Sequence, residues 1–304
     1  MTDAVDRAPA HVAASAVLRV GGRELDLARR FAVMAIVNRT PDSFYDRGRT
    51  DALDAAVRAG AAAFEAGADL VDVGGVKFAP GPPVPVDEEI ERVVPVVREL
   101  APLGPVSVDT FHPEVAVAAI DAGASVVNDT TGIHDPRMAD VVADSDAAIV
   151  VAHSLAAPRT QLPLPHYDDV VGEVAAFLRE RVALAEEHGI PRERIVVDPG
   201  HDLNKNTLQT LELTRRLDEL GDLGLPLLVA LSNKDFVGES LGRDRDDRVA
   251  GSLAAAVYCA LHGARIVRVH NVRESVDALR MVEAILGWRQ PVRLRHNLRP
   301  EGNG

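Results

Sequence analysis

The chain has one cysteine, Cys259, among 304 residues. A single cysteine excludes an intramolecular disulfide and a cysteine-based zinc site. Because it lies in the apolar stretch 252–261, we predict that Cys259 is a buried structural residue. The sequence also lacks a run of about 18 apolar residues, and residues 1–16 lack the apolar centre of a signal peptide. We therefore expect a cytoplasmic protein with no membrane partner.

Positive charge and aromatic side chains are both scarce. The 33 Lys and Arg residues are outnumbered by 46 Asp and Glu residues, which gives a formal charge of -13 at pH 7. This charge excludes general binding to nucleic acid, although one basic pocket could hold an anionic ligand. Aromatic residues make up 4% of the chain and hydrophobic residues 47%. Such a composition, rich in Ala, Val and Leu, is typical of packed helices and parallel strands.

Eight short apolar runs recur along the chain, and most of the intervals between them are long enough for a helix. The runs are 31–38, 68–75, 105–110, 125–129, 147–153, 194–200, 226–232 and 264–270. Nearly continuous apolar strands are expected where both faces of a sheet are buried. Eight βα units predict an α/β fold, a single (β/α)₈ TIM barrel over residues 31–288. An open doubly wound sheet is the alternative.

A polar residue marks the C-terminal end of every run. These residues are Asn38, Asp72, Asp109, Asn128, His153, Asp198, Ser232 with Lys234, and Arg268 with His270. An open sheet would concentrate its ligand contacts at one switch point. A ring of polar strand ends therefore favours the barrel.

Two alternating segments, 16–20 and 23–27, flank Gly21-Gly22 before the first apolar run. This pattern predicts a β-hairpin with a primed turn, which we expect to plug the N-terminal end of the barrel. We expect residues 16–290 to form one domain between mobile tails, 1–15 and 291–304. Four glycines that precede apolar runs are predicted to be helix C-caps rather than ligand contacts: Gly60, Gly67, Gly123 and Gly263.

Part of the strand-end ring could bind a flat heterocycle. Asp109, Asn128 and Asp198 offer acceptors for amino and ring N–H groups, and Lys234 could meet a neighbouring carbonyl. Each residue alone is more commonly a helix cap or a solvated side chain. Found together at adjacent strand ends, they predict the acidic half of a binding site.

The basic half of the predicted site involves the last strand and the first. Arg268 and His270 alternate along the last strand, so both point to one side of it. With Asn38 on the neighbouring strand, they could hold a diphosphate and its metal ion. His153 is instead predicted to be structural, because no second metal ligand lies at suitable spacing on its strand. A Schiff-base role for Lys234 is disfavoured by its polar surroundings.

These residues lie in motifs that resemble the dihydropteroate synthase family across about residues 16–285. The motifs are Asn38-x-Thr40-Pro41-Asp42-Ser43-Phe44, Asp72-Val73-Gly74-Gly75, Ser107-Val108-Asp109-Thr110, Asn128-Asp129, Asp198-Pro199-Gly200 and Arg268-Val269-His270. The segments Pro158-Arg159-Thr160 and 166–171 are similar to bacterial members. In that family, a pterin-binding TIM barrel, a dihydropterin diphosphate loses pyrophosphate with Mg²⁺ assistance and p-aminobenzoate attacks its methylene carbon. The product is a folate precursor.

The resemblance implies a small-molecule pterin ligand and a homodimer. By position, it implies pterin contacts from Asp109, Asn128, Asp198 and Lys234, and diphosphate contacts from Asn38, Arg268 and His270. Asn38 would also contact the metal, and Asp198 and Lys234 would act in catalysis if the chain is active. The carboxylate of Asp198 could stabilise a cationic pterin ring.

The second loop departs from the family pattern. The family reads Gly-Gly-Glu-Ser-Thr-Arg-Pro-Gly, whereas residues 74–81 read Gly-Gly-Val-Lys-Phe-Ala-Pro-Gly. Phe78 and Ala79 thus replace a Thr and an Arg that help to bind diphosphate and to build the p-aminobenzoate pocket. Losing these hydrogen bonds would cost about 3 to 6 kcal/mol, or on the order of 10² to 10⁴ in rate or affinity. Further departures are Arg39, Ser154, Leu203, Asn233 and Asn271.

We therefore predict a degenerate, inactive paralogue that could retain weak binding of a pterin or an inhibitor. One alternative is a working synthase in which Arg39 and Lys77 restore positive charge, although a Lys cannot reproduce a guanidinium fork. Others are an enzyme for another diphosphate or pterin-like substrate, and a regulatory pterin-binding protein.

Overall fold

A computed structural model describes residues 17–39, 49–76, 81–157, 159–160 and 164–296. Its centre is a closed barrel of eight parallel strands in the order β10-β3-β4-β5-β6-β7-β8-β9. The strands are β3 (Ala32–Asn38), β4 (Leu70–Gly74), β5 (Val106–Asp109), β6 (Val126–Asp129), β7 (Ala148–Ala152), β8 (Ile195–Asp198), β9 (Leu227–Ala230) and β10 (Ala264–Val269). Each lies within one of the eight apolar runs. The predicted TIM barrel is confirmed, and the open-sheet alternative is wrong.

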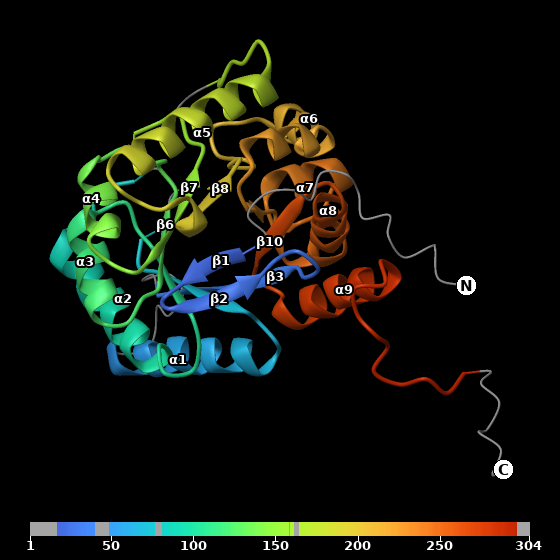
Figure 1. The fold of residues 1–304 in the computed structure, drawn as a ribbon, viewed down its shortest axis with the longest axis horizontal. Coiled ribbons are helices and arrows are strands. Elements are labelled where there is room, and N and C mark those ends of the chain that lie inside the picture. The colour runs from blue at the N-terminus through green and yellow to red at the C-terminus, as the bar shows by residue number, and fades with distance from the viewer. Residues whose placement is uncertain (1–16, 40–48, 77–80, 158, 161–163, 297–304) are drawn as a thin grey trace.

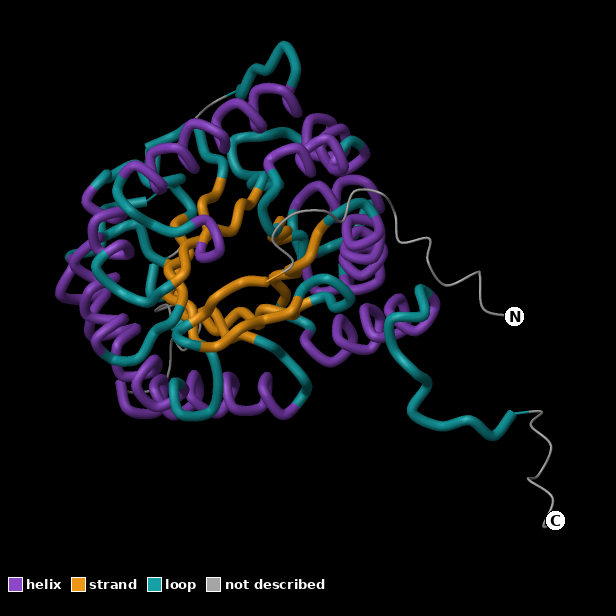
Figure 2. The backbone as a smooth tube through the Cα atoms, in the orientation of Figure 1, coloured by secondary structure: helices purple, strands orange, loops and turns teal. Residues whose placement is uncertain are grey.

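Helices surround the barrel on its outer side (Figures 1 and 2). They are α1 (Arg49–Glu65), α2 (Val86–Leu100), α3 (Pro113–Asp121), α4 (Arg137–Ala143), α5 (Val170–Glu187), α6 (Thr207–Arg215), α7 (Asp235–Leu241), α8 (Val249–Leu261) and α9 (Val272–Ile285). Short 3₁₀ segments occur at Arg192–Arg194, Leu217–Leu223 and Arg245–Asp247. Both α7 and α8 lie between β9 and β10, so that unit has an extra helix.

Strand residues divide between two cores because side chains alternate along each strand. On β3, Val33, Ala35 and Val37 belong to the large core between the strands and the helices. Ala32 and Met34 belong to a smaller core inside the barrel. The interior stripe is therefore the set of even-numbered positions on β3. This parity decides which strand-end residues reach the barrel mouth.

The N-terminal hairpin fills one end of the barrel, as predicted. Strands β1 (Val17–Val20) and β2 (Arg23–Asp26) pair antiparallel. Gly21 and Gly22 have φ values of 52° and 74°, which fit a primed turn. Leu18, Val20 and Leu27 are buried in the interior core with strand side chains. Figure 1 shows the hairpin lying across the N-terminal end of the barrel, opposite the mouth formed by the strand ends.

Three of the four predicted C-cap glycines end helices, and one does not. Gly67, Gly123 and Gly263 have positive φ values just after α1, α3 and α8. Gly60 instead lies inside α1, so its prediction as a cap is wrong. A Cβ atom at Gly60 would lie 2.4 Å from Cδ1 of Leu100. Close packing of α1 on α2 therefore explains this glycine.

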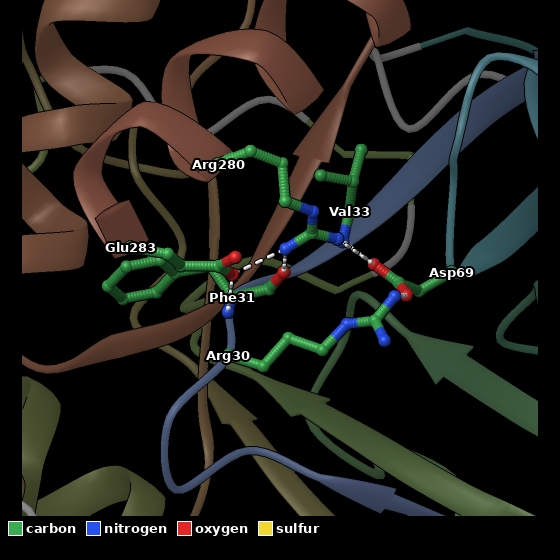
Figure 3. A network of polar contacts seen from close by, with 6 residues as sticks. All are labelled: Arg30, Phe31, Val33, Asp69, Arg280 and Glu283. Carbon is green, nitrogen blue, oxygen red and sulfur yellow. Dashed lines mark hydrogen bonds and ion pairs between the residues drawn. The ribbon is translucent and has the colours of Figure 1, made fainter. Parts of the chain in front are cut away.

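A polar network joins α9 to the start of β3 (Figure 3). Glu283 accepts a hydrogen bond from the backbone N–H of Phe31 at 2.9 Å, and Arg280 donates to the Phe31 carbonyl at 2.9 Å. Asp69 accepts from the Val33 N–H at 2.9 Å and pairs with Arg280 at 3.2 Å. Side chains from α9 and from the loop before β4 thus satisfy the first backbone groups of β3.

The remaining global predictions concern Cys259 and the chain ends. Cys259 is fully buried, as predicted, and burial raises the pKa of its thiol to about 12. Within the part of the chain that the structure describes, no helix is long and apolar enough to cross a membrane. The predicted tail 1–15 lies outside the described residues. After α9 the described chain is exposed at 289–296, and Figure 1 shows it leading away from the barrel.

Candidate functional site

The predicted site residues continue the interior stripe of the barrel beyond its apolar core. Strand register places Asn38 opposite Gly74, Gly74 opposite Asp109, and Asp109 opposite Asn128. A Cβ atom at Gly74 would lie 3.3 Å from Oδ1 of Asn38 and 3.6 Å from Cβ of Asp109. The glycine thus leaves room for Asn38 and Asp109 to approach each other. The inward-facing positions are thus apolar inside the barrel, as at Ala32 and Met34, and polar at its mouth, as at Asn38.

Arg268 lies at the centre of the acidic group. Its Nε donates to Oδ2 of Asp72 at 2.6 Å, and its Nη2 donates to Oδ2 of Asp109 at 2.8 Å. Asn128 donates from Nδ2 to the same Asp72 oxygen at 3.1 Å. Asp72 is fully buried, whereas the Asp109 side chain is 19% exposed. The predicted division into an acidic and a basic half is therefore wrong for Arg268.

Asp109 is the carboxyl of this group whose protonation changes near neutral pH. Burial raises its pKa to about 7, since the opposing charge of Arg268 is offset by Asp72 and Glu89. Burial also acts to lower the pKa of Arg268, but Asp72 and Asp109 together raise it above its usual value. Arg268 therefore stays charged, and Asp109 can either accept or donate a hydrogen bond to a ligand.

Asp198 and Lys234 lie on the opposite side of the mouth. Burial raises the pKa of Asp198, although Lys234 and the N–H of Gly200 favour the carboxylate. That N–H donates to Oδ1 of Asp198 at 2.7 Å. The Lys234 ammonium donates to the His201 carbonyl, and burial lowers its pKa against the effect of Asp198. Asp198, the last residue of β8, is 5% exposed.

His153 does not belong to the mouth. The interior positions on β7 are even-numbered, including Ala148 and Val150, so His153 lies on the helix side of the barrel. Its ring packs edge-on against Phe177 of α5, with centroids 4.8 Å apart. Its Nδ1 lies 2.8 Å from Nζ of Lys205. Burial, followed by the charge of Lys205, lowers the His153 pKa to about 2, so this neutral ring has the predicted structural role.

Lys205 is a buried amine that sequence patterns did not single out. Its Nζ also donates to the carbonyls of Gly200 and Leu203 at 2.9 and 3.0 Å. Burial lowers the Lys205 pKa to about 7, although Asp198 acts in the opposite direction. The only available signal was its position between a strand end and the N-cap Asn206. Lys205 holds together the loop that carries the carbonyl partner of Lys234.

Ser154 departs from the family pattern, and its contact with Asn204 explains the change. Oδ1 of Asn204 accepts hydrogen bonds from the Ser154 hydroxyl at 2.9 Å, from the Leu155 N–H at 2.9 Å and from the Ala156 N–H at 3.2 Å. Tyr167 donates its hydroxyl to the Asn204 carbonyl at 2.9 Å. The loops after β7 and β8 are therefore fastened to each other beside the mouth.

His270 and Asn38, the two other predicted diphosphate contacts, lie at the ends of the neighbouring strands β10 and β3. The ring Nδ1 of His270 lies 3.2 Å from the Ser232 hydroxyl. Burial and then Arg268 lower the His270 pKa to about 4, so the ring is neutral at pH 7. Asn38 is exposed at the end of β3. Residues 40–48 and 77–80, which include the rest of the Asn38 loop together with Lys77, Phe78 and Ala79, lie outside the described residues.

The Arg39 side chain contacts α2. Its Nη1 donates to the carbonyls of Glu91 at 3.0 Å and Arg92 at 2.9 Å. Pro95, inside α2, lacks the N–H that would otherwise bond to Glu91. The guanidinium therefore supplies a donor to a carbonyl that the helix leaves without one.

The donor set limits how a metal could bind. Among the described residues, no group of three or more His, Cys, Asp or Glu side chains could hold a metal ion. Asn38 offers one amide oxygen. Mg²⁺ commonly keeps several waters and binds through few protein oxygens together with substrate phosphates. The donors among the described residues therefore suit Mg²⁺ only in company with a bound diphosphate.

Comparison with known proteins identifies the family of this chain. The pterin binding enzyme family matches this chain over residues 34–270. The chain belongs to this family. It is 45% identical over 278 residues to the inactive dihydropteroate synthase 2 of Mycobacterium leprae, covering 88% of this chain and 94% of that protein. It is 40% identical over 272 residues to the dihydropteroate synthase of Escherichia coli K12, covering 88% and 96%.

Solved structures give the same assignment. Dihydropteroate synthase from Xanthomonas albilineans with 4-aminobenzoic acid is similar to this chain, with a TM-score of 0.83 and 44% identity, covering 89% of this chain and 98% of that one. The enzyme from Burkholderia cenocepacia complexed with 7,8-dihydropteroate has a TM-score of 0.82 and 38% identity, covering 90% and 98%. The resemblance to the dihydropteroate synthase family is thereby confirmed.

Proposed function

We propose that this chain is a degenerate dihydropteroate synthase homologue that binds a pterin weakly and lacks efficient condensation of dihydropterin diphosphate with p-aminobenzoate. The observation that carries the proposal is the second loop, where Phe78 and Ala79 stand in place of the family's Thr and Arg. A relative with 45% identity has the name of an inactive synthase, which supports the same reading. Compensation by Arg39 is disfavoured, because its Nη1 bonds to two carbonyls of α2.

The pterin floor is the part of the site that remains. Asp109 and Asn128 lie in register at adjacent strand ends, and Asp198 and Lys234 lie across the mouth. Carboxyl and amide groups there can accept from the amino and N–H groups of a pterin, while Lys234 can donate to its carbonyl. Asp109 with a pKa of about 7 can accommodate either protonation state of a ligand edge.

The diphosphate side is where we expect the chemistry to fail. Departure of pyrophosphate needs donors and cations directed at the developing charge. Asn38 and His270 are present, and Mg²⁺ bound with the diphosphate would neutralise part of the charge and take an oxygen from Asn38. Arg268, however, is held by Asp72 and Asp109. Its Nε and Nη2 are engaged there, so fewer of its N–H groups remain for a diphosphate.

Turnover and binding test the proposal separately. We expect no efficient turnover of dihydropterin diphosphate with p-aminobenzoate in steady state, and measurable heat on titration with a pterin in the presence of Mg²⁺. The matched variant carries the family loop, with Val76→Glu, Lys77→Ser, Phe78→Thr and Ala79→Arg, and should turn over faster than the natural chain. Turnover of the natural chain within about tenfold of a typical synthase would overturn the proposal.

A working synthase is the second candidate, and the retained strand-end residues favour it. Asp109, Asn128, Asp198 and Arg268 all lie at one mouth of the barrel. The E. coli relative named dihydropteroate synthase is 40% identical to this chain. The turnover measurement separates the two candidates, because a working synthase needs no grafted loop.

The proposal extends to assembly and location. We infer a homodimer that pairs through α8 and α9, where Tyr258, Leu261, Met281 and Ile285 are 37%, 44%, 59% and 71% exposed. Apolar side chains gathered on neighbouring helices favour association. Light scattering should give twice the chain mass, and Ile285→Glu should shift it toward the monomer. A cytoplasmic location is supported by the single buried cysteine.

A further inference from the structure

A groove of about 750 Å³ lies at the N-terminal end of the barrel, opposite the mouth. Its lining comes from the hairpin, from the C-terminal ends of α2, α3 and α4, and from the residues that lead into β5, β6 and β7. A volume of this size falls in the range of binding sites. None of the predicted pterin or diphosphate contacts, all of which the structure describes, lines it. The groove is therefore separate from the candidate site.

The groove carries negative charge. Four exposed carboxylates line it, namely Asp121, Asp140, Asp144 and Asp146. Arg23 is the one cation among the described lining residues. Oδ1 of Asp140 lies 2.6 Å from Nδ1 of His188, and the other three carboxylates form no ion pair with a described residue. Helices α2 and α3 also end here, so the carbonyl ends of their dipoles add to the negative charge. Such a lining favours a cationic partner.

Apolar side chains contribute to the same lining. Val117 is 44% exposed, and Ile120 and Val141 are partly exposed beside the acidic groups. A small hydrated cation would leave this apolar surface uncovered, and a purely apolar ligand would leave the carboxylates without a partner. The groove therefore matches a peptide segment in which apolar and basic side chains alternate.

Residues 289–296, which follow α9, have this alternation. Val292 and Leu294 are 83% and 65% exposed. Arg293 and Arg295 come directly after them, and neither forms an ion pair with a described residue. In an extended chain the two apolar side chains point to one side and the two arginines to the other. The segment contains no Asp or Glu, although the whole chain has a formal charge of -13. Its chemistry is therefore complementary to that of the groove.

The groove and the segment lie on different sides of the same barrel. Figure 1 shows α3 and α4 across the barrel from α9, with the hairpin between them. The described chain after α9 is exposed and leads away from its own barrel. This direction points the segment toward the groove of another copy.

We propose that the segment 289–296 of one copy docks in this groove on a second copy. Its two apolar side chains cover Val117, and its two arginines pair with the carboxylates of the groove. The contact is head-to-tail, because the two partners use different surfaces. The groove lies across the barrel from α8 and α9, so this contact is distinct from the pairing inferred for those helices. It also lies opposite the mouth, so it stands or falls separately from the proposed function.

Engineered cysteines test the docking on the full chain, because the native Cys259 is fully buried. Chains with Leu294→Cys are mixed with chains with Val117→Cys under a mild oxidant, and mass spectrometry measures the mixed disulfide. Leu155→Cys is the matched control, since Leu155 lies outside the groove and is 46% exposed, close to the 44% of Val117. Docking raises the effective concentration of the two thiols, so we expect the disulfide with position 117 to form at least about tenfold faster.

Equal rates at the two positions would overturn the proposal. A chain that carries both Leu294→Cys and Val117→Cys separates the two sources of the segment. A disulfide within single chains, with none between mixed chains, would show that the segment binds its own barrel, and would overturn docking on a second copy.

Charge reversal tests the complementarity. Arg293→Glu with Arg295→Glu in the Leu294→Cys chain should slow the mixed disulfide at least about tenfold, and Asp144→Arg with Asp146→Arg in the partner chain should restore part of the rate. About 1 M salt should also slow the reaction of the natural pair, because it screens exposed charges beyond about 3 Å. A rate that responds to neither the charge reversal nor the salt would mean that the exposed thiols merely collide, and would overturn the proposal.

Discussion

The Arg39 guanidinium donates a hydrogen bond to the carbonyl oxygen of Glu91, 3.0 Å away, in the middle of α2. This carbonyl would normally accept from residue 95, but Pro95 has no N–H. A residue at the exit of β3 thereby satisfies a helix carbonyl that lies 52 residues further along the chain. The family has a small residue at position 39, and this contact with Glu91 explains the Arg found there in this chain.

We predict that Arg39→Ala lowers the free energy of unfolding by about 1 kcal/mol, the usual contribution of one hydrogen bond. The same change should cost less in a Pro95→Ala background, since residue 95 then donates to Glu91 itself. Urea unfolding of the four proteins gives the coupling energy directly. Equal costs in the two backgrounds would contradict the contact.

Arg39→Ala also tests the idea that Arg39 restores diphosphate binding. Because its guanidinium bonds to α2, we expect the variant to bind pyrophosphate with Mg²⁺ within about twofold of the natural chain. Isothermal calorimetry measures this. A loss of about tenfold or more would show that Arg39 leaves α2 when the anion binds.

Arg268 is predicted to be important for stability. Arg268→Ala leaves the fully buried Asp72 carboxylate without its cation, and removing one partner of a buried pair costs about 3–5 kcal/mol. Adding Asp72→Asn should recover part of that loss. Arg137→Ala, which breaks the exposed pairs with Asp135 and Glu114, serves as the control and should cost much less. Thermal unfolding followed by circular dichroism compares them.

Asp109 should make stability fall as pH rises toward neutrality. Its pKa is about 7 in the folded chain, against 3.8 for an aspartate in an unstructured peptide, so between these values the folded state holds a proton that the unfolded state has released. The contribution of Asp109 is therefore greatest below the unfolded pKa and is lost as pH rises through about 7. Asp109→Asn removes this dependence.

The measurement is the urea midpoint of both proteins at about pH 5 and about pH 8. We expect the natural chain to lose more stability over this interval than Asp109→Asn does. Glu89→Gln offers a second check, because removing a neighbouring negative charge should lower the Asp109 pKa in a carbon-13 NMR titration. A pKa that stays unchanged in Glu89→Gln would show that the two carboxyls do not interact.

The barrel and its strand ends could be predicted from sequence because both follow from local patterns. Each apolar run covers one strand, and its last interior residue points into the mouth. The parity that places Asp109 inside also places His153 outside, so the alternation along residues 147–153 excludes His153 from the ring. Contacts such as Arg268 with Asp109, 159 residues apart, depend on which rotamers meet across the mouth. No local pattern encodes that choice.

Asn204 offers the sharpest test of how the mouth is held. Its φ of 51° is a left-handed conformation that few residues besides Gly and Asn adopt easily, and its Oδ1 accepts three hydrogen bonds from residues 154–156. Asn204→Ala loses the acceptor and meets the backbone strain, so we expect a cost of about 2–3 kcal/mol. Asn204→Gly loses only the acceptor and should cost less. Ser154→Ala removes one of the three donors and should cost least.

Chemical denaturation ranks the three variants, and hydrogen exchange at the N–H groups of Leu155 and Ala156 reports the loop itself. Exchange should accelerate in both Asn204 variants because each N–H loses its acceptor, and stay near the natural rate in Ser154→Ala. A chain in which Asn204→Gly is as stable as the natural protein, with unchanged exchange at Leu155, would mean that the side chain of Asn204 does not join the loops after β7 and β8.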